Sequence, residues 1–254
     1  MKAAMIEHDR LFLELLSNFF REFVELCLWD ITQYINLDSL VFLEVEKELF
    51  ADLAYWAGSD NYLLAQVEYS QTAESNQEEE DNSSLLILVV HQATPKYNFS
   101  EVMYHYFSRL FINYGKKLYP VVLYSNDTPV QFEPNIYERM FLGNGVSLRY
   151  PVIQLNLLHW GYFLGQLNPV ATAFMAKTPM KQEERPLVKL ASWRQLAQLA
   201  LAPEKQQIVL RFINTYLDLN DQEEAVFQAE LAKLEIEERE QILNMVNGGQ
   251  LIST

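Results

Sequence analysis

Residues 85–90 have the sequence LLILVV, and this short stretch decides the fold that we expect. Alternate residues of a strand face opposite sides of a sheet, so a strand that is apolar at every position must be covered on both faces. Segments 62–69 and 118–124 also read as strands, and the alternation that begins at Leu40 and runs to Glu46 indicates another. The sequence therefore predicts a sheet in which residues 85–90 form a central strand.

Helices are expected on both sides of these strands in the sequence. Residues 8–27 repeat apolar side chains at intervals of three and four, which builds one wide buried face of a helix. Residues 99–114 are rich in aromatic side chains and end at Gly115, a typical C-terminal cap residue. We therefore expect one helix before the sheet and one between its last two long strands.

The last third of the chain has a helical pattern. Shorter strands, broken by the sequence GNG at 143–145, are expected between residues 136 and 156. After about Trp160 the sequence predicts helices at roughly 170–177, 187–200, 203–217 and 221–246. The expected fold class is α/β: a mixed sheet flanked by helices over residues 1–165, and a helical C-terminal portion over residues 166–254 packed on that core.

Composition narrows the function classes. The net charge is -15 and the 19 basic residues are scattered, so the whole-molecule field disfavours a broad grip on a nucleic acid. The one cysteine, Cys27, excludes an internal disulfide and a cysteine metal cluster, and we expect a buried, inert thiol. Residues 1–10 lack the apolar core of a signal peptide, and residues 85–90 are far too short to span a bilayer. We expect a cytoplasmic protein without membrane contact.

Residues 70–84 separate two expected strands and contain five acidic residues with almost no apolar ones. Such a segment cannot bury enough apolar surface to fold, so a solvated, mobile insertion is the preferred interpretation. A metal-binding or DNA-mimicking loop is the alternative. Near a cleft, its charge would repel a phosphate backbone.

Eight short segments together resemble one bacterial protein family, especially its cyanobacterial members. The resemblance covers nearly the whole chain apart from the acidic segment, and it depends on the order of the segments because none is specific alone. They are HDRLF at 8–12 with ELL at 14–16, KELFAD at 47–52, LLAQV at 63–67, HQA at 91–93, YPVV at 119–122, VIQLN at 152–156, NPVA at 168–171 and EEAVFQAE at 223–230. The family is that of the Rpn-like, transposase-associated PD-(D/E)XK nucleases.

This resemblance implies a restriction-endonuclease-like core and a metal-dependent chemistry. Active members cut DNA with an acid on one strand and a Glu-x-Gln sequence on the next. The two carboxylates bind Mg²⁺, which polarises the phosphate and lowers the pKa of the attacking water, and the third residue orients that water. The resemblance places these three positions at Tyr62, Val90 and Gln92. Valine has no lone pair and a neutral tyrosine is a poor Mg²⁺ ligand, so we expect a degenerate site.

Other acids leave a second hypothesis open. Asp60 precedes Tyr62 by two residues and would share its face on a continuing strand, although a turn after Gly58 is the simpler interpretation. Glu48 and Asp52 match a family segment and are candidate partners for Asp60. Glu14 matches a family helix position, so it is a further candidate metal ligand, but it falls on the polar helix face.

Two functions follow from these residues. The first is a pseudo-nuclease that needs no cofactor and acts as a binding or scaffold protein, with an unknown protein or DNA as partner and possible homo-oligomers. The second is an active Mg²⁺-dependent DNA endonuclease that uses Asp60 with Glu48 or Asp52 and Gln92. His91, between Val90 and Gln92, is expected to face the other way as a packed or hydrogen-bonded side chain rather than a base.

Overall fold

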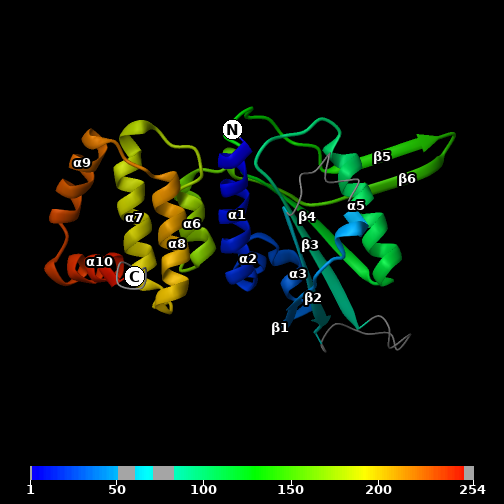
Figure 1. Cartoon of the computed structure of the whole chain (residues 1–254), viewed down its shortest axis with the longest axis horizontal. Helices are drawn as coiled ribbons and strands as arrows, with labels where there is room; N and C mark the ends of the chain where they lie inside the picture. Colours follow the sequence, from blue (N-terminus) through cyan, green and yellow to red (C-terminus); the bar gives the residue numbers. More distant parts are fainter. Residues whose placement is uncertain (1, 51–60, 71–82, 249–254) are drawn as a thin grey trace. The chain divides into compact units, whose positions relative to one another are not determined.

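A computed structural model describes residues 2–50, 61–70 and 83–248, and the chain in it forms two compact units (Figure 1). The sheet unit comprises Met1–Leu13 and Cys27–Gln154, and the helical unit comprises Glu14–Leu26 and Leu155–Thr254. The expected boundary was residue 165, whereas the division falls after Gln154. Glu14 pairs with Arg211, which explains why part of the first helix belongs with the C-terminal helices.

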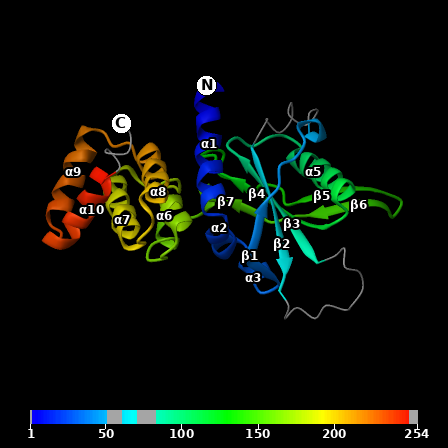
Figure 2. The ribbon, with the colours of Figure 1, turned by 60° about the horizontal axis from the view of Figure 1, so that its bottom comes forward.

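The sheet unit contains a five-stranded mixed sheet in the order β1-β2-β3-β4-β7 (Figure 1, Figure 2). The antiparallel part runs from β1 to β3, and β4 and β7 continue it in parallel with β3. The strands are β1 (Ile35–Phe42), β2 (Tyr62–Tyr69), β3 (Ser84–Gln92), β4 (Lys117–Tyr124) and β7 (Val152–Gln154). All nine residues of β3 are buried, which confirms the expected central strand.

The helices in the first half of the chain agree with the expected ones except at their breaks. The expected helix over 8–27 is two helices, α1 (Lys2–Asn18) and α2 (Phe20–Cys27), followed by the short α3 (Trp29–Thr32). Helix α5 (Phe99–Tyr114) has the expected bounds, and Gly115 ends it with φ +62°. The left-handed conformation at this position favours glycine.

The expected strand over residues 40–46 is wrong in its second half. Strand β1 begins earlier, at Ile35, and ends at Phe42, and the 3₁₀ helix η1 (Lys47–Phe50) follows. Leu43 and Val45 nevertheless pack against the main apolar cluster. The alternation of apolar and polar residues here therefore results from contact of Leu43 and Val45 with the core and not from a continued strand.

The main apolar cluster fills the space between one face of the sheet and α5. Side chains from β2, β3 and β4 meet the buried face of α5 there, and each fully buried Leu, Val or Phe contributes roughly 1.5–3 kcal/mol. Its members include Phe50, Leu64, Leu86, Leu88, Val90, Val102, Met103, Tyr106, Leu110 and Val122. We call this side of the sheet the α5 face, and the side on which Phe12 of α1 stacks against His91 the α1 face.

A separate hairpin follows the sheet strands. It is formed by β5 (Ile136–Phe141) and β6 (Asn144–Arg149), which pair only with each other in the described part of the chain. Leu142 and Gly143 connect them with φ values of +49° and +82°. Two successive positive φ values characterise the tight hairpin turns that match strand twist, and they account for the expected break near the GNG sequence.

Besides most of α2 and the end of α1, the helical unit contains five α-helices within the described residues. They are α6 (Pro169–Met175), α7 (Arg185–Gln198), α8 (Pro203–Tyr216), α9 (Asp221–Ala232) and α10 (Ile236–Gly248), joined in part by the 3₁₀ helices η3 (Leu155–Leu157), η4 (Trp160–Tyr162) and η5 (Gln182–Glu184). The expected single helix over 221–246 is wrong, because residues 233–235 separate α9 from α10. Asn168 caps α6 by accepting hydrogen bonds from Val170 and Ala171.

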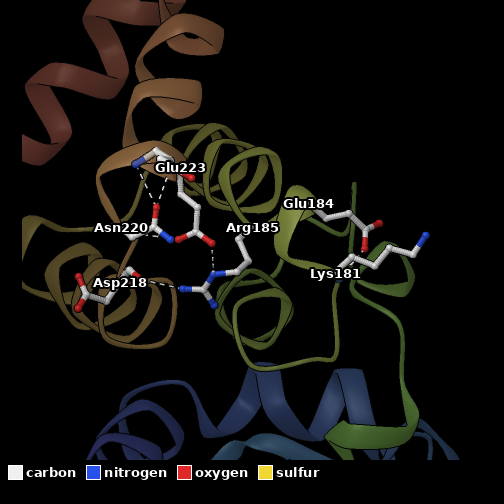
Figure 3. Close-up of polar contacts among 7 residues, drawn as sticks. Lys181, Glu184, Arg185, Asp218, Asn220 and Glu223 are labelled. Atoms are coloured by element: carbon white, nitrogen blue, oxygen red, sulfur yellow. Dashed lines mark hydrogen bonds and ion pairs between the residues drawn. The ribbon is translucent and has the colours of Figure 1, made fainter.

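Figure 3 shows the polar side chains that join the start of α7 to the loop before α9. Arg185 donates from Nε to Glu223 Oε1 at 3.1 Å and from Nη2 to the carbonyl oxygen of Asp218 at 2.7 Å. Asn220 accepts from the backbone N–H of Glu223 at 3.0 Å, and the Glu223 carboxylate accepts from the backbone N–H of Asn220 at 2.9 Å. Arg185 at the start of α7 thus binds the reciprocal capping box at the start of α9 and stabilises the contact between these two helices.

Candidate functional site

The structure brings together the three positions that the family resemblance assigns to catalysis. Tyr62 lies directly opposite Val90 in the antiparallel pairing of β2 and β3. Gln92 follows Val90 by two residues on the same strand, so it belongs to the same face. These positions therefore lie next to one another on the α5 face, at the carboxyl end of β3.

The surroundings of these positions are apolar. The Tyr62 ring meets Phe50 edge to face at 5.1 Å between centroids and lies 5.9 Å from Tyr106. Phe50 and Tyr106 also contact each other, at 4.6 Å. Val90 is 0% exposed within the same cluster. Aromatic rings and aliphatic side chains thus occupy the place where the family chemistry needs two carboxylates.

The alternative metal ligands are placed differently by the structure. Glu48 is exposed on η1, and Glu14 forms an ion pair with Arg211 of α8. Asp52, Asp60 and most of the acidic segment 70–84 lie outside the described residues. Within residues 2–50, 61–70 and 83–248, no group of three or more His, Cys, Asp or Glu side chains could hold a metal ion. The described residues of the α5 face do not fit a Mg²⁺ site.

A row of polar residues crosses the carboxyl ends of the three parallel strands. Gln92 lies beside Tyr124 in the pairing of β3 with β4, and Tyr124 lies beside Gln154 in the pairing with β7. Gln154 accepts from the backbone N–H of Glu133 at 2.9 Å and donates to the carbonyl oxygen of Gln131 at 2.9 Å. Burial raises the pKa of Tyr124. The row is neutral, and Gln154 in it holds a loop in place.

The α1 face carries an ordered chain of polar side chains at the same edge. His91 Nδ1 lies 3.0 Å from Asp9 Oδ1, and His91 Nε2 lies 2.7 Å from Ser125 Oγ. His8 Nε2 lies 2.8 Å from the same Ser125 oxygen. His91 and Ser125 are 0% and 1% exposed, whereas 25% of the Asp9 side chain remains accessible. We call these four residues the histidine–serine chain.

The positions of the protons in this chain follow from its charges and donors. A carboxylate can only accept, so Asp9 favours a proton on His91 Nδ1. In the neutral imidazole, His91 Nε2 is then an acceptor, and the Ser125 hydroxyl is its donor. Ser125 Oγ keeps lone pairs that accept from His8 when Nε2 of that ring carries the proton. The serine hydroxyl is thereby polarised toward His91.

Backbone contacts hold this chain in place. Asn61 Nδ2 donates to the carbonyl oxygen of His91 at 2.7 Å, and the backbone N–H of His91 donates to the carbonyl oxygen of Asn61 at 2.8 Å. The Phe12 ring stacks on the His91 ring at 4.3 Å. The backbone N–H of Ser125 donates to the backbone carbonyl oxygen of Gln92 at 2.9 Å, which fixes the serine directly after β4.

Lys96 interacts electrostatically with Asp9 of this chain. Burial lowers the pKa of Lys96, while the charge of Asp9 acts in the opposite direction. Lys96 lies in the connection between β3 and α5, so Asp9 experiences both an imidazole and an ammonium group nearby. The edge therefore combines acidic, basic and hydroxyl groups within one small region.

The sequence predicted part of this arrangement. The contacts of His91 with Phe12 and Ser125 confirm that it is a packed and hydrogen-bonded side chain, whereas the expectation that it is not a base stays an untested prediction. The sequence carries no local signal that singles out Ser125, and Asp9 enters the sequence analysis only within the segment HDRLF at 8–12. A histidine inside a buried strand is the signal that could have prompted a search for hydroxyl and carboxyl partners.

Comparisons with known proteins identify no relative of this chain: no family model matches it, nor does any curated protein or solved structure. Among the helices that the structure describes, none is both long and apolar enough to span a membrane. The interpretation of the site therefore depends on its residues and their geometry.

Proposed function

We propose that this chain is an Rpn-like, PD-(D/E)XK-type protein with a restriction-endonuclease-like core that has lost nuclease catalysis and acts as a binding or scaffold protein. The pairing of Tyr62 with Val90 carries this proposal, because it places two non-ligating side chains side by side where the family chemistry requires two metal-binding carboxylates. The packing of Phe50 and Tyr106 around Tyr62 supports it further.

Charge and exposed apolar residues favour a protein partner over DNA. The net charge of -15 opposes the approach of a polyanion. Met140, Phe141 and Leu142 are 58%, 78% and 85% exposed at the tip of the β5–β6 hairpin. Neighbouring exposed apolar side chains of this kind are common at protein contact surfaces. Substitutions at this tip would change binding without removing buried contacts of the sheet unit.

The alternative function is an active Mg²⁺-dependent DNA endonuclease that uses Asp60 with Glu48 or Asp52 and Gln92. It is favoured by one observation, the position of Gln92, which is 2% exposed at the carboxyl end of β3 beside the paired Tyr62 and Val90. Asp60 precedes the first residue of β2 by two positions.

Nicking of supercoiled plasmid in Mg²⁺ or Mn²⁺ distinguishes the two functions. The experiment compares the natural chain with Asp60→Ala and Gln92→Ala, and uses Asp38→Ala, an exposed acid on β1, as the matched control. We expect no nicking by any of the four proteins. Nicking by the natural chain and by Asp38→Ala that is lost in Asp60→Ala and Gln92→Ala would establish the endonuclease instead.

A further inference from the structure

We propose that Ser125 is a nucleophile, activated by His91 and Asp9, and that the site acts on small carboxylic esters. The three residues come from different parts of the chain and meet in the order carboxylate, imidazole, hydroxyl, at 3.0 Å and 2.7 Å. The Ser125 Oγ–His91 Nε2 contact is a hydrogen bond, and Asp9 Oδ1 lies at ion-pair distance from the opposite ring nitrogen, Nδ1. This activity is independent of metal-dependent DNA cleavage.

The direction of proton transfer supports a nucleophile. The negative charge of Asp9, 3.0 Å from Nδ1, favours the Nδ1–H form of His91, in which Nε2 accepts the Ser125 proton as a general base. The imidazolium that forms is stabilised by the same carboxylate at 3.0 Å. Burial of His91 excludes water and strengthens this attraction.

The position of Ser125 in the fold also suits a reactive group. It directly follows β4, at the carboxyl ends of two parallel strands, β3 and β4. In open α/β sheets, ligands bind at this end of the strands. His91 lies one strand away near the end of β3, so the sheet itself fixes the distance between base and hydroxyl.

His8 provides both a cover and a second proton donor. Ser125 is 1% exposed, and His8 Nε2 lies 2.8 Å from its oxygen, so the His8 ring is one of the groups that cover Oγ. His8 itself is partly exposed on α1. Removal of its side chain would therefore open the approach to Ser125 without changing Asp9 or His91.

The reaction proceeds in two balanced steps. In the first, Ser125 Oγ bonds to the ester carbonyl carbon while its proton passes to His91 Nε2. The bond to the alkoxy group then breaks, and the proton leaves with the alcohol. In the second step, water gives a proton to His91 Nε2 while its oxygen bonds to the acyl carbon. The bond from this carbon to Ser125 Oγ then breaks, His91 returns the proton to Oγ, and the carboxylic acid leaves.

The test uses phenylmethanesulfonyl fluoride, a small reagent that sulfonylates activated serines with loss of fluoride. The full chain is incubated with it, and the adduct is timed by intact mass and located by peptide mapping. We expect one adduct, on Ser125, and none in Ser125→Ala. Ser192 is the internal control, since it is 0% exposed but donates to the carbonyl oxygen of Val188 instead of a histidine.

Three variants test the roles of the other residues. His91→Gln keeps an acceptor for the serine hydroxyl but no base, and should slow the adduct by about 100-fold or more. Asp9→Asn should slow it in the same direction, whereas His8→Ala should accelerate it several-fold. The natural chain and His8→Ala should also hydrolyse p-nitrophenyl acetate, with the faster turnover in His8→Ala.

Two results would overturn the proposal. The first is the absence of a Ser125 adduct in both the natural chain and a folded His8→Ala variant, or an adduct whose rate is unchanged in His91→Gln. The second needs no variant: nitrogen NMR of the natural chain at neutral pH should show His91 as the Nδ1–H tautomer. A proton on Nε2 instead would remove the base.

Discussion

The two faces of the sheet at the carboxyl end of β3 differ in almost every chemical respect. On the α5 face, Tyr62 and Val90 are embedded among aromatic and aliphatic side chains. On the α1 face, His91 contacts a carboxylate and a serine hydroxyl in an ordered chain. Adjacent residues of one strand thus serve an apolar core and a polar network. The positions that the resemblance to nucleases assigns to catalysis therefore lie on the α5 face, whereas the histidine–serine chain lies on the α1 face.

The largest expected effect comes from placing a carboxylate on the α5 face. Val90→Glu would bury an unpaired charge in the cluster, and should lower the free energy of unfolding by about 3–5 kcal/mol. Urea unfolding followed by circular dichroism measures the loss. Val41→Glu is the matched control, since Val41 is 58% exposed on β1, and it should change stability by no more than about 0.5 kcal/mol.

Equal stability of Val90→Glu and Val41→Glu would contradict an apolar α5 face. A second arm adds Mg²⁺ or Mn²⁺ to the double variant Tyr62→Asp with Val90→Glu, which restores both family carboxylates. Because the two positions are directly paired, the metal should bind the folded variant and raise its midpoint of unfolding. No metal effect on a folded double variant would count against the assignment of these positions.

Removal of the serine hydroxyl tests the α1 face with an intermediate effect. Ser125→Ala leaves the ring nitrogens of His8 and His91 without their shared partner, and should cost about 1–3 kcal/mol. Ser17→Ala serves as the control, because Ser17 is exposed and only bonds back to its own helix. An equally small change in both variants would show that the histidine–serine chain does not stabilise the fold.

The smallest effect is expected for the equivalent loss of a hydroxyl on the α5 face. Tyr62→Phe keeps the ring that packs on Phe50, so the change in unfolding free energy should stay below about 1 kcal/mol. Urea unfolding of Tyr62→Phe beside Ser125→Ala compares the two hydroxyls directly. A larger loss of unfolding free energy in Tyr62→Phe than in Ser125→Ala would contradict the assignment of the polar network to the α1 face.

Cys27 gives a chemical check on burial in the sheet unit. The residue is half-buried, and burial of its thiol raises the pKa to about 12. The unfolded thiol ionises near pH 9, so this group favours the unfolded chain progressively as pH rises from 9 toward 12. Folded protein at pH 8 should therefore react with Ellman's reagent far more slowly than protein in guanidinium chloride. Equal rates would contradict a buried thiol.

Local patterns were enough to predict most elements of the fold. The uniform apolarity of residues 85–90 predicted a covered central strand, and Gly115 predicted the end of α5, where φ is +62°. The bounds failed where tertiary contacts produced the same pattern as a strand, as at Leu43 and Val45. The break between α9 and α10 carries no proline or glycine at residues 233–235, so composition alone could not reveal it.

The sequence predicted only those features of the site that depend on a single strand. Strand parity placed Gln92 with Val90 and turned His91 to the other face, which the structure confirms. The partners of His91 are Asp9 and Ser125, which lie 82 positions before it and 34 after it in the chain. Only the packing of α1 and β4 against β3 brings them together, and no local pattern reports such contacts.

Calorimetric titration of Mn²⁺ into the full chain measures whether the α5 face binds a metal ion. Since Tyr62 and Val90 provide no carboxylates, we expect the Mn²⁺ titration to give only the heat of dilution. Asp60→Ala and Gln92→Ala should give the same trace. A saturable, near-stoichiometric binding heat that disappears in both variants would contradict the account and restore a metal site at this end of the sheet.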